Sequence, residues 1–454
     1  MSQLDTRLGT LLEDRKRKNR FRSLKEYDPS RSGLIDFSSN DYLSLTSSRS
    51  LRDAFISRLS TSSQIVGSTG SRLLSGGTPA HRQLEDRLAV FFNSPAALLF
   101  NSGWDANVSF FSTVPQPEDW VVYDELVHAS VHSGLRASRV RPERRIGFTH
   151  NDPSSLASVL QRITNEPSGS QQGTVFLALE SLYSMDGDMA QLPKLLDVLD
   201  EHVPRSRQCV VLDEAHSTGV YGEGGRGIGH ALGEEGGWCD GEDKGGRVGV
   251  RLMTFGKAVG SSGAVLLCSP TIRSFLINFA RPLIFSTALP HSTLISLECA
   301  WDLLSGPDGD SRRESLMNLA IYFHALLSPL LLRTPRSILT LPPSSDAPFP
   351  SSTSPFLPSN PLSPIIGLLT PAPHALSSFL LARGFIVRPV VPPTVPPGAE
   401  RVRICLRAEM DKDVVERLIK ALGEWVDREI RPSTRGGGEA PPRGLQVVSL
   451  KAKL

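Results

Sequence analysis

The sequence has almost no net charge and few cysteines, and each scarcity excludes a class of protein. Its 49 lysines and arginines against 47 aspartates and glutamates leave a formal charge of +2 over 454 residues. No global basic field therefore favours nucleic acid or a membrane surface as a partner. The 5 cysteines form no CxxC pair and no closely spaced framework, so neither a disulfide scaffold nor a zinc site is indicated. We expect no metal and a reducing interior.

Long hydrophobic runs are also missing. No uninterrupted apolar run approaches the roughly 20 residues that span a bilayer, and the N-terminus lacks the apolar core of a signal peptide. We therefore expect a protein that is neither secreted nor inserted into a membrane. Ala452-Lys453-Leu454 is a near variant of the Ser-Lys-Leu peroxisomal address. Its presence predicts recognition by a peroxisomal import receptor, with a cytoplasmic location as the default otherwise.

Short apolar segments recur along the chain and have the composition of strands. They are rich in Val, Leu and Phe, too short for helices, and separated by segments long enough for crossover helices. The segments are 96–100, 120–123, 174–180, 208–213, 251–255 and 263–269. Apolar residues at helical spacing predict helices over 80–92 and 154–163. Buried, mainly parallel strands with helices on both faces are expected, which makes the fold class α/β.

Shifts in composition divide the chain into four predicted parts. These are an N-terminal helical or extended segment (1–60), a large domain (61–300), a smaller C-terminal α+β domain (301–430) and a tail (431–454). The smaller domain is predicted from the strand-like PIIGLL, FIVRPV and RVRICL and from a helical pattern over 413–426.

Two stretches interrupt this pattern and are predicted to be surface insertions. The first, 233–249, is rich in glycine, and the second, 341–364, is rich in proline and serine. Neither composition buries enough apolar surface to order itself.

Two ionisable residues follow predicted strands in a way that favours catalysis. Asp213 ends the strand QCVVLD, and ligands of open α/β sheets bind outside the carboxyl ends of strands. The same aspartate would also serve as a helix N-cap, which needs no ligand. Lys257 follows the strand RLMTF in a glycine-lined turn. Most such lysines are simply solvated, but partial desolvation would lower the pKa and make the amine a nucleophile for a carbonyl compound.

Together, these two residues indicate pyridoxal phosphate as cofactor. It needs a lysine to attach its aldehyde and a carboxylate to keep its pyridine nitrogen protonated. Its phosphate needs donors, and Gly103 and Trp104 follow a strand at a predicted helix N-terminus. A ring above the cofactor is also expected, and His128 lies just past the strand WVVY. A lone histidine at such a place is more often structural or exposed.

A series of motifs, in order, resembles the α-oxoamine synthases, a fold-type I family of pyridoxal-phosphate enzymes, from about residue 34 to residue 426. The motifs are FSSNDYLSL (37–45), VGSTGSRLLSGGTPAHRQLEDRLAVFF (66–92), FNSGWDAN (100–107), HAS (128–130), ESLYSMDGDMAQL (180–192), DEAHSTGVYGEGGRG (213–227), TFGKAVGSSGA (254–264), IFSTALP (284–290) and VRPVVPPTVPPGAERVRI (387–404). The resemblance implies a fold-type I transferase, with a large domain built on a mainly parallel sheet and a smaller α+β domain.

The resemblance also implies roles for residues around the cofactor. Lys257 would attach the cofactor and then remove the α-proton of the amino acid, while Asp213 would pair with the pyridinium nitrogen. His128 would stack on the ring, and His216 would hydrogen-bond its phenolic oxygen. The remaining cofactor contacts would come from Gly103, Trp104, Ser184 and Thr254 of the same chain and from Ser286 and Thr287, which would reach the phosphate of a neighbouring subunit in a homodimer.

Four further residues would bind the substrates. Asn40 and Arg403 would hold the amino-acid carboxylate, the arginine as a bidentate charge-assisted pair. Thr394 and an N-terminal arginine, Arg22 or the equally available Arg20, would contact the acyl substrate.

The activity implied by the resemblance is an acyl transfer. L-alanine would condense with a pimeloyl thioester such as pimeloyl-CoA and lose CO2, giving an amino ketone precursor of biotin and a free thiol. One alternative is a related synthase that uses another acyl-CoA or amino acid, in secondary or sphingoid-type metabolism. A second is a catalytically silent subunit, which the intact Lys257, Asp213 and His216 argue against.

Overall fold

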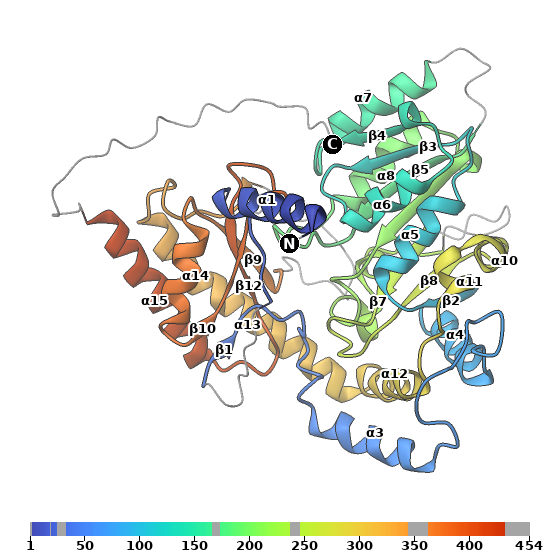
Figure 1. Ribbon diagram of the computed structural model, residues 1–454, viewed down its shortest axis with the longest axis horizontal. Helices are drawn as coiled ribbons and strands as arrows, with labels where there is room; N and C mark the ends of the chain where they lie inside the picture. The colour runs from blue at the N-terminus through green and yellow to red at the C-terminus, as the bar shows by residue number, and fades with distance from the viewer. Residues whose placement is uncertain are drawn as a thin grey trace.

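The computed structural model describes residues 2–18, 20–24, 33–165, 173–236, 246–343 and 362–431. The predicted tail and its Ala452-Lys453-Leu454 lie outside the described residues, as does most of each predicted insertion. The chain forms two bodies, each built around its own sheet, with the long helix α13 (Pro307–Leu332) between them (Figure 1).

The first body is built on a seven-stranded sheet in the order β2-β8-β7-β6-β5-β3-β4. Its strands are β2 (Ala96–Phe100), β3 (Trp120–Asp124), β4 (Arg145–Phe148), β5 (Val175–Glu180), β6 (Gln208–Asp213), β7 (Val248–Thr254) and β8 (Ala264–Cys268). The pairs from β4 to β7 are parallel, and β8 runs antiparallel to both of its neighbours. The predicted mainly parallel sheet and its six predicted strands are confirmed. The pattern missed β4, because this short edge strand begins with an arginine and is only partly buried.

Helices cover both faces of this sheet. One core cluster joins Leu98, Val121 and Val211 to the helices α5 (Gly103–Thr113), α6 (Ala129–Ala137) and α10 (Pro270–Phe279). Another joins alternate strand residues to α7 (Pro153–Thr164) and α8 (Leu192–His202) on the opposite face. Because successive strand residues point to opposite faces, fully buried strands are apolar throughout. The remaining helices of this body are α4 (Pro79–Phe91), α9 (Ile228–Ala231), α11 (Arg281–Phe285) and α12 (His291–Leu304), with short 3-10 turns at Pro142–Arg144, Arg205–Arg207 and Glu223–Gly225.

The second body is built on an antiparallel sheet in the order β11-β12-β9. It comprises β9 (Ile365–Leu369), α14 (Pro373–Leu381), β10 (Phe385–Ile386), β11 (Arg388–Val390), β12 (Arg401–Cys405) and α15 (Lys412–Ile430). The N-terminal part joins it, since β1 (Ile35–Asp36) pairs in parallel with β10. The helix α1 (Gln3–Arg17) precedes this part of the chain and has no buried residue. The helix α3 (Arg49–Thr61) packs against α12 (Figure 1).

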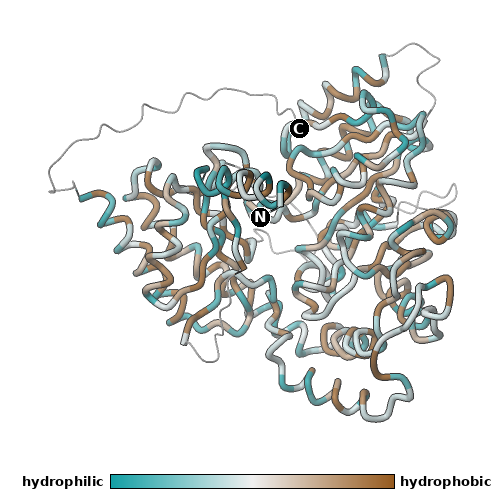
Figure 2. Tube along the Cα trace, in the orientation of Figure 1, coloured by the Kyte–Doolittle hydropathy of each residue, from teal (hydrophilic) through white to brown (hydrophobic). Residues whose placement is uncertain are grey.

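Within the described residues, α13 is the one helix long and apolar enough to cross a membrane by length and composition. The sequence predicted no such segment because polar residues interrupt its apolar runs, although no charged residue follows Glu314 in this helix. Its buried side chains, among them Leu316, Phe323 and Leu327, belong to the main hydrophobic core. It also packs on α12 and α15. Figure 2 shows that apolar and polar residues alternate over the helices of the protein as a whole. About a third of its most apolar window, 33%, is buried in these contacts.

The described ends of the first predicted insertion are integrated into the fold. Val248 begins β7, and the backbone amide of Val248 donates to the carbonyl oxygen of Glu234 at 2.9 Å. The guanidinium of Arg247 forms an ion pair with the carboxylate of the buried Glu234. The glycine-rich composition did not predict these contacts, because they join the two ends of the stretch.

Candidate active site

The candidate site lies at the carboxyl edge of the seven-stranded sheet, where several strands end together. Asp213 is the last residue of β6, Thr254 is the last residue of β7, and Lys257 follows three residues later. Because β8 is antiparallel to β7 and β2 is antiparallel to β8, β2 also ends at this edge, and α5 begins there at Gly103. The topology therefore brings together the strand ends that the sequence analysis singled out.

The amine of Lys257 lies at one end of a continuous chain of hydrogen bonds. Its Nζ is 2.9 Å from Nε2 of His216, and Nδ1 of His216 is 2.7 Å from the hydroxyl of Tyr42. The Tyr42 hydroxyl donates to Oδ1 of Asn40 at 3.1 Å. Burial lowers the pKa of His216 well below its ordinary value, so its neutral ring can accept from Lys257 and donate to Tyr42.

The surroundings of Lys257 favour its uncharged amine. Burial lowers the pKa of its ammonium group to about 8, and the nearby Asp213 carboxylate opposes part of that shift by favouring the charged form. An amine that loses its proton near neutral pH is a nucleophile for a carbonyl carbon. The expected desolvation of Lys257 is therefore present in the fold.

Asp213 is buried on the face of the sheet that α5 covers. Its Oδ2 accepts a hydrogen bond from Nδ2 of Asn107 at 2.8 Å, and its Oδ1 accepts one from the backbone amide of Ala215 at 2.9 Å. A carboxylate has about four acceptor positions, so capacity remains for a further donor such as a protonated ring nitrogen. Glu180 lies in register beside it on β5. Burial, followed by the neighbouring Asp213, raises the pKa of Glu180 well above its ordinary value.

The turn after β2 is shaped to receive a group against the backbone. A Cβ added to Gly103 would lie 3.3 Å from Oγ1 of Thr254, so glycine keeps the start of α5 open beside that hydroxyl. The ring of Trp104 lies edge-on to the ring of His128, with centroids 5.8 Å apart. The side chain of His128 is exposed and caps α6, which fits both a structural and a stacking role.

Ser286 and Thr287 lie near the same turn within this chain. Nδ2 of Asn101 donates to the Ser286 hydroxyl at 3.2 Å and to the Thr287 carbonyl oxygen at 2.8 Å. The Thr287 side chain is exposed, and is therefore available to a molecule that approaches from outside.

The proposed carboxylate-binding pair comes together between β12 and the segment that follows β1. Nη1 of Arg403, on β12, donates to Oδ1 of Asn40 at 2.9 Å, and its Nε donates to the backbone carbonyl of Ser184 at 2.6 Å. Its Nη2 donates to the Tyr42 hydroxyl at 3.3 Å. The hydrogen-bond chain from Lys257 thus ends on a buried arginine, and an arginine can pair with the carboxylate of an amino acid. Ser184 contributes its backbone carbonyl to this arrangement.

The two residues expected to contact the acyl group are also adjacent. Nη2 of Arg22 donates to Oγ1 of Thr394 at 3.3 Å, although the residues are 372 positions apart. Of the two arginines that the sequence left open, Arg20 has its backbone in the cap of α1, and Arg22 is the one that reaches Thr394.

Sequence reasoning missed several residues that complete the site. Tyr42 links His216 to Asn40, Asn107 holds Asp213, and Glu180 lies beside Asp213. Tyr42 stands in the quoted motif FSSNDYLSL two residues after Asn40, and that closeness was a usable signal. Asn107 offered only its spacing of one helical turn from Gly103.

A buried ion pair stabilises the segment between Asp213 and His216. The guanidinium of Arg251 lies 2.8 Å from the carboxylate of Glu214, and their side chains are 1% and 0% exposed. The same carboxylate accepts hydrogen bonds from the backbone amide of Ile228 and the hydroxyl of Ser217. The pair is thus fully hydrogen-bonded, which makes its burial tolerable.

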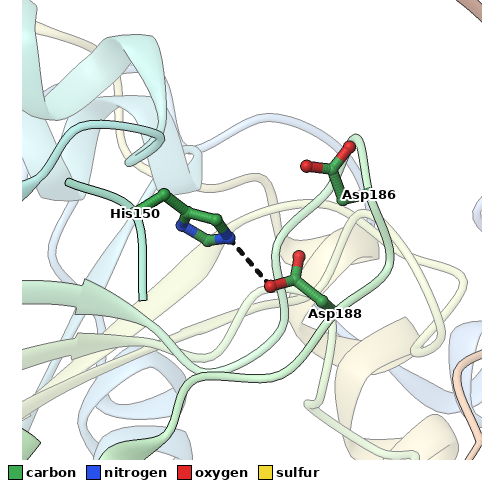
Figure 3. A group of neighbouring side chains, drawn as sticks. All are labelled: His150, Asp186 and Asp188. Atoms are coloured by element: carbon green, nitrogen blue, oxygen red, sulfur yellow. Dashed lines mark hydrogen bonds and ion pairs between the residues drawn. The ribbon is translucent and has the colours of Figure 1, made fainter. Parts of the chain in front are cut away.

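A second charged cluster lies close to the sheet edge and has the residue types of a metal site. His150, Asp186 and Asp188 offer ligand atoms that all lie within 4.8 Å of one another (Figure 3). Both ring nitrogens of His150 are already occupied by carboxylates, those of Asp124 and Asp188, at 2.9 and 2.8 Å. Asp186 forms an ion pair with Arg401. The cluster is therefore an ion-pair network whose cations are side chains.

Comparison with known proteins places the chain among enzymes that share this architecture. Residues 32–422 match the model of the aminotransferase class I and II family. The chain is 40% identical over 408 residues to 8-amino-7-oxononanoate synthase of Emericella nidulans, covering 89% of this chain and 92% of that protein. It is 30% identical over 428 residues to aminoacyl transferase sphA of Aspergillus fumigatus, covering 92% and 86%.

A solved structure gives the same fold. A variant of serine palmitoyltransferase from S. paucimobilis with a bound PLP-myriocin aldimine has a TM-score of 0.71 and 24% identity, and the match covers 87% of this chain and 88% of that chain. This likeness confirms the expected fold-type I architecture. The family model and the 40% identical relative both match most of the chain. The chain therefore belongs to the 8-amino-7-oxononanoate synthases of the aminotransferase class I and II family.

Proposed function

We propose that this protein condenses L-alanine with a pimeloyl thioester, with loss of CO2, to give 8-amino-7-oxononanoate and a free thiol. The observation that carries the chemistry is the chain of hydrogen bonds from the Lys257 amine through His216 to Asn40 and Arg403. It joins a nucleophilic amine to a carboxylate-binding site. The choice of alanine and a pimeloyl group is supported by the 40% identity to the Emericella nidulans synthase.

Pyridoxal phosphate is the cofactor, and the residues present fit it. When bound, it supplies a pyridinium ring that accepts an electron pair. Asp213, which keeps acceptor capacity, would pair with the ring nitrogen. His128 would stack on the ring, and His216, whose Nε2 is 2.9 Å from the Lys257 amine, would hydrogen-bond its phenolic oxygen. The backbone at Gly103 and Trp104 and the hydroxyl of Thr254, which lies beside Gly103, would help to hold the cofactor's phosphate.

Different residues of the chain bind the two substrates and move the proton. Arg403 and Asn40 hold the carboxylate of alanine, so its α-proton faces Lys257, which removes it once the amine is free. The deprotonated α-carbon then bonds to the acyl carbon as the thiol leaves, and the carboxylate that Arg403 held is afterwards lost as CO2. The grip of Arg403 on that carboxylate must be released before this bond breaks. Arg22 and Thr394 contact the acyl chain.

The second candidate function is an acyl transfer with a different acyl donor, and the 30% identity to the sphA aminoacyl transferase supports it. The two functions are separated by assaying the purified enzyme with alanine, glycine and serine against pimeloyl-CoA and palmitoyl-CoA, with thiol release as the readout. We expect alanine with pimeloyl-CoA to be the preferred pair. Preference for serine or palmitoyl-CoA would reject the biotin assignment and leave the family unchanged.

We also propose that the enzyme is a homodimer with shared sites. The exposed apolar side chains Val66, Leu74 and Phe285, which are 69%, 82% and 74% exposed, flank the segment that carries Ser286 and Thr287. The backbone joins them, since the amide of His291 donates to the carbonyl of Val66 at 2.8 Å. Such a group of apolar side chains fits a protein interface.

A subunit-mixing experiment tests the shared sites. A Lys257→Ala chain and a chain carrying Ser286→Ala with Thr287→Ala are each weakly active or inactive. If the phosphate contacts come from the neighbouring chain, a mixed dimer has one intact site and activity reappears on mixing. If activity does not reappear although mixed dimers form, the two hydroxyls act within their own chain.

We further propose that Ala452-Lys453-Leu454 directs the enzyme to peroxisomes, as its similarity to Ser-Lys-Leu indicates. A fluorescent protein fused ahead of the full chain should colocalise with a peroxisomal marker. Deletion of Leu454 should release it to the cytoplasm, and an unchanged distribution would reject the proposal.

A further inference from the structure

The turn formed by residues 183–188, here called the coupling turn, touches both bodies of the protein. It is closed by backbone hydrogen bonds of 2.9 Å from the amide of Tyr183 to the carbonyl of Asp188 and from the amide of Gly187 to the carbonyl of Tyr183. Gly187 has a φ of +76°, and a Cβ there would overlap the carbonyl oxygen of Ile365 on β9. Only glycine allows the turn to approach the smaller sheet this closely.

On the side of the seven-stranded sheet, the turn is anchored by His150. The ring of His150 bridges Asp124, which ends β3, to Asp188 in the turn. Its ring also packs edge-on against Tyr183, with centroids 4.5 Å apart. The neighbouring Asn151 adds a hydrogen bond of 2.9 Å from its Nδ2 to the same Asp188 carboxylate. These bonds fix one side of the turn to the strand ends that form the site.

On the side of the smaller sheet, the turn holds two arginines of β12. Nη1 of Arg401 donates to the carbonyl of Met185 at 3.2 Å and pairs with Asp186. Nε of Arg403 donates to the carbonyl of Ser184 at 2.6 Å. The guanidinium plane of Arg403 is therefore set by the turn on one edge and by Asn40 and Tyr42 on the other.

We propose that His150 is a positioning residue for the amino-acid substrate: through Asp188 it fixes the coupling turn, and the turn fixes the guanidinium group of Arg403. This inference rests on the proposed function, because it assigns the carboxylate of alanine to Arg403. Both ring nitrogens of His150 are bonded to carboxylates, so in this proposal it acts through the turn and is a positioning residue.

The test compares His150→Asn with His374→Asn in the holoenzyme. Asparagine is too short to bridge Asp124 and Asp188, and His374 is an exposed histidine on α14 that provides a matched control. Two dissociation constants are measured by the absorbance of the bound cofactor, one for pyridoxal phosphate and one for L-alanine. For His150→Asn we expect alanine to bind about tenfold more weakly, where tenfold corresponds to about 1.4 kcal/mol. Cofactor binding should change by less than about twofold, and the control should match the wild type.

Coupling to Arg403 is tested by a double-mutant cycle, since residues that act through one network have non-additive effects. In an Arg403→Lys background, His150→Asn should weaken alanine binding no further. If His150→Asn does not yield folded holoenzyme, Asp188→Asn, which keeps the size of the side chain and removes the charge that faces His150, replaces it in the same cycle.

Three results would overturn the inference. They are unchanged alanine affinity in the variant, an equal loss of cofactor and alanine affinity, and full additivity with Arg403→Lys. A wild-type enzyme that shows no absorbance change with alanine would instead reject the proposed function, and the inference with it.

Discussion

The depressed pKa of Lys257 gives a prediction that can be measured on the protein without its cofactor. Only the uncharged amine attacks the aldehyde of pyridoxal phosphate. With a pKa of about 8, about a quarter of the amine is uncharged at about pH 7.5, against about one molecule in a thousand for an ordinary lysine with a pKa of 10.5. Burial in this site thus raises the fraction of reactive amine at neutral pH by about 200-fold, and cofactor attachment should be faster for that reason.

The assay follows the absorbance change of pyridoxal phosphate mixed rapidly with the apoprotein between about pH 6 and pH 10. The rate should rise with pH and level off above a midpoint of about 8. Asp213→Asn should move this midpoint lower, because the Asp213 carboxylate favours the charged amine. A rate that still climbs tenfold per pH unit through about pH 9.5 in the wild type, or a midpoint that rises in Asp213→Asn, would refute the reasoning.

Three further predictions concern turnover and stability. Lys257→Ala should abolish turnover while the fold persists, as judged by circular dichroism; full activity would reject its covalent role. Arg251→Met leaves the Glu214 carboxylate buried without its partner, so urea unfolding should show a loss of about 3–5 kcal/mol; a loss below about 1 kcal/mol would contradict this. Burial lowers the pKa of His150, but its hydrogen bonds to Asp124 and Asp188 outweigh this and raise it to about 10 from 6.5. The stabilisation from protonated His150 is therefore full below about pH 6.5 and lost by about pH 10. The loss of unfolding free energy caused by His150→Asn, measured in urea, should shrink over that range. A loss that stays constant with pH would contradict this prediction.

The seven-stranded sheet was largely predictable because its signals are local. A run such as QCVVLD is apolar on both faces, so it predicts a buried strand, and its last residue must lie at the carboxyl edge. The same logic placed Lys257, since the strand before it and the glycines around it are adjacent in sequence. Edge strand β4 escaped, because a strand that is exposed on one side carries no continuous apolar run.

The rest of the site depends on contacts between distant parts of the chain. Tyr42 and His216 are 174 positions apart, and Arg22 and Thr394 are 372 apart. No periodicity records such pairs, and only the resemblance to a family pointed to the second one. The bridge from His150 to Asp188 spans 38 positions, and neither residue stands in an apolar pattern that would have drawn notice. Side chains that act by holding another residue leave no local pattern in the sequence, so only the fold shows their contacts.

The relay of side chains from Lys257 to Arg403 has a thermodynamic consequence. Lys257 attaches the cofactor and Arg403 binds the amino acid. Binding at one end changes which hydrogen-bond donors and acceptors are free along the relay. Linkage then requires reciprocity. If the bound cofactor raises the affinity for the amino acid by some factor, the bound amino acid must raise the affinity for the cofactor by the same factor. The order in which the two arrive would leave the final affinity of the assembled complex unchanged.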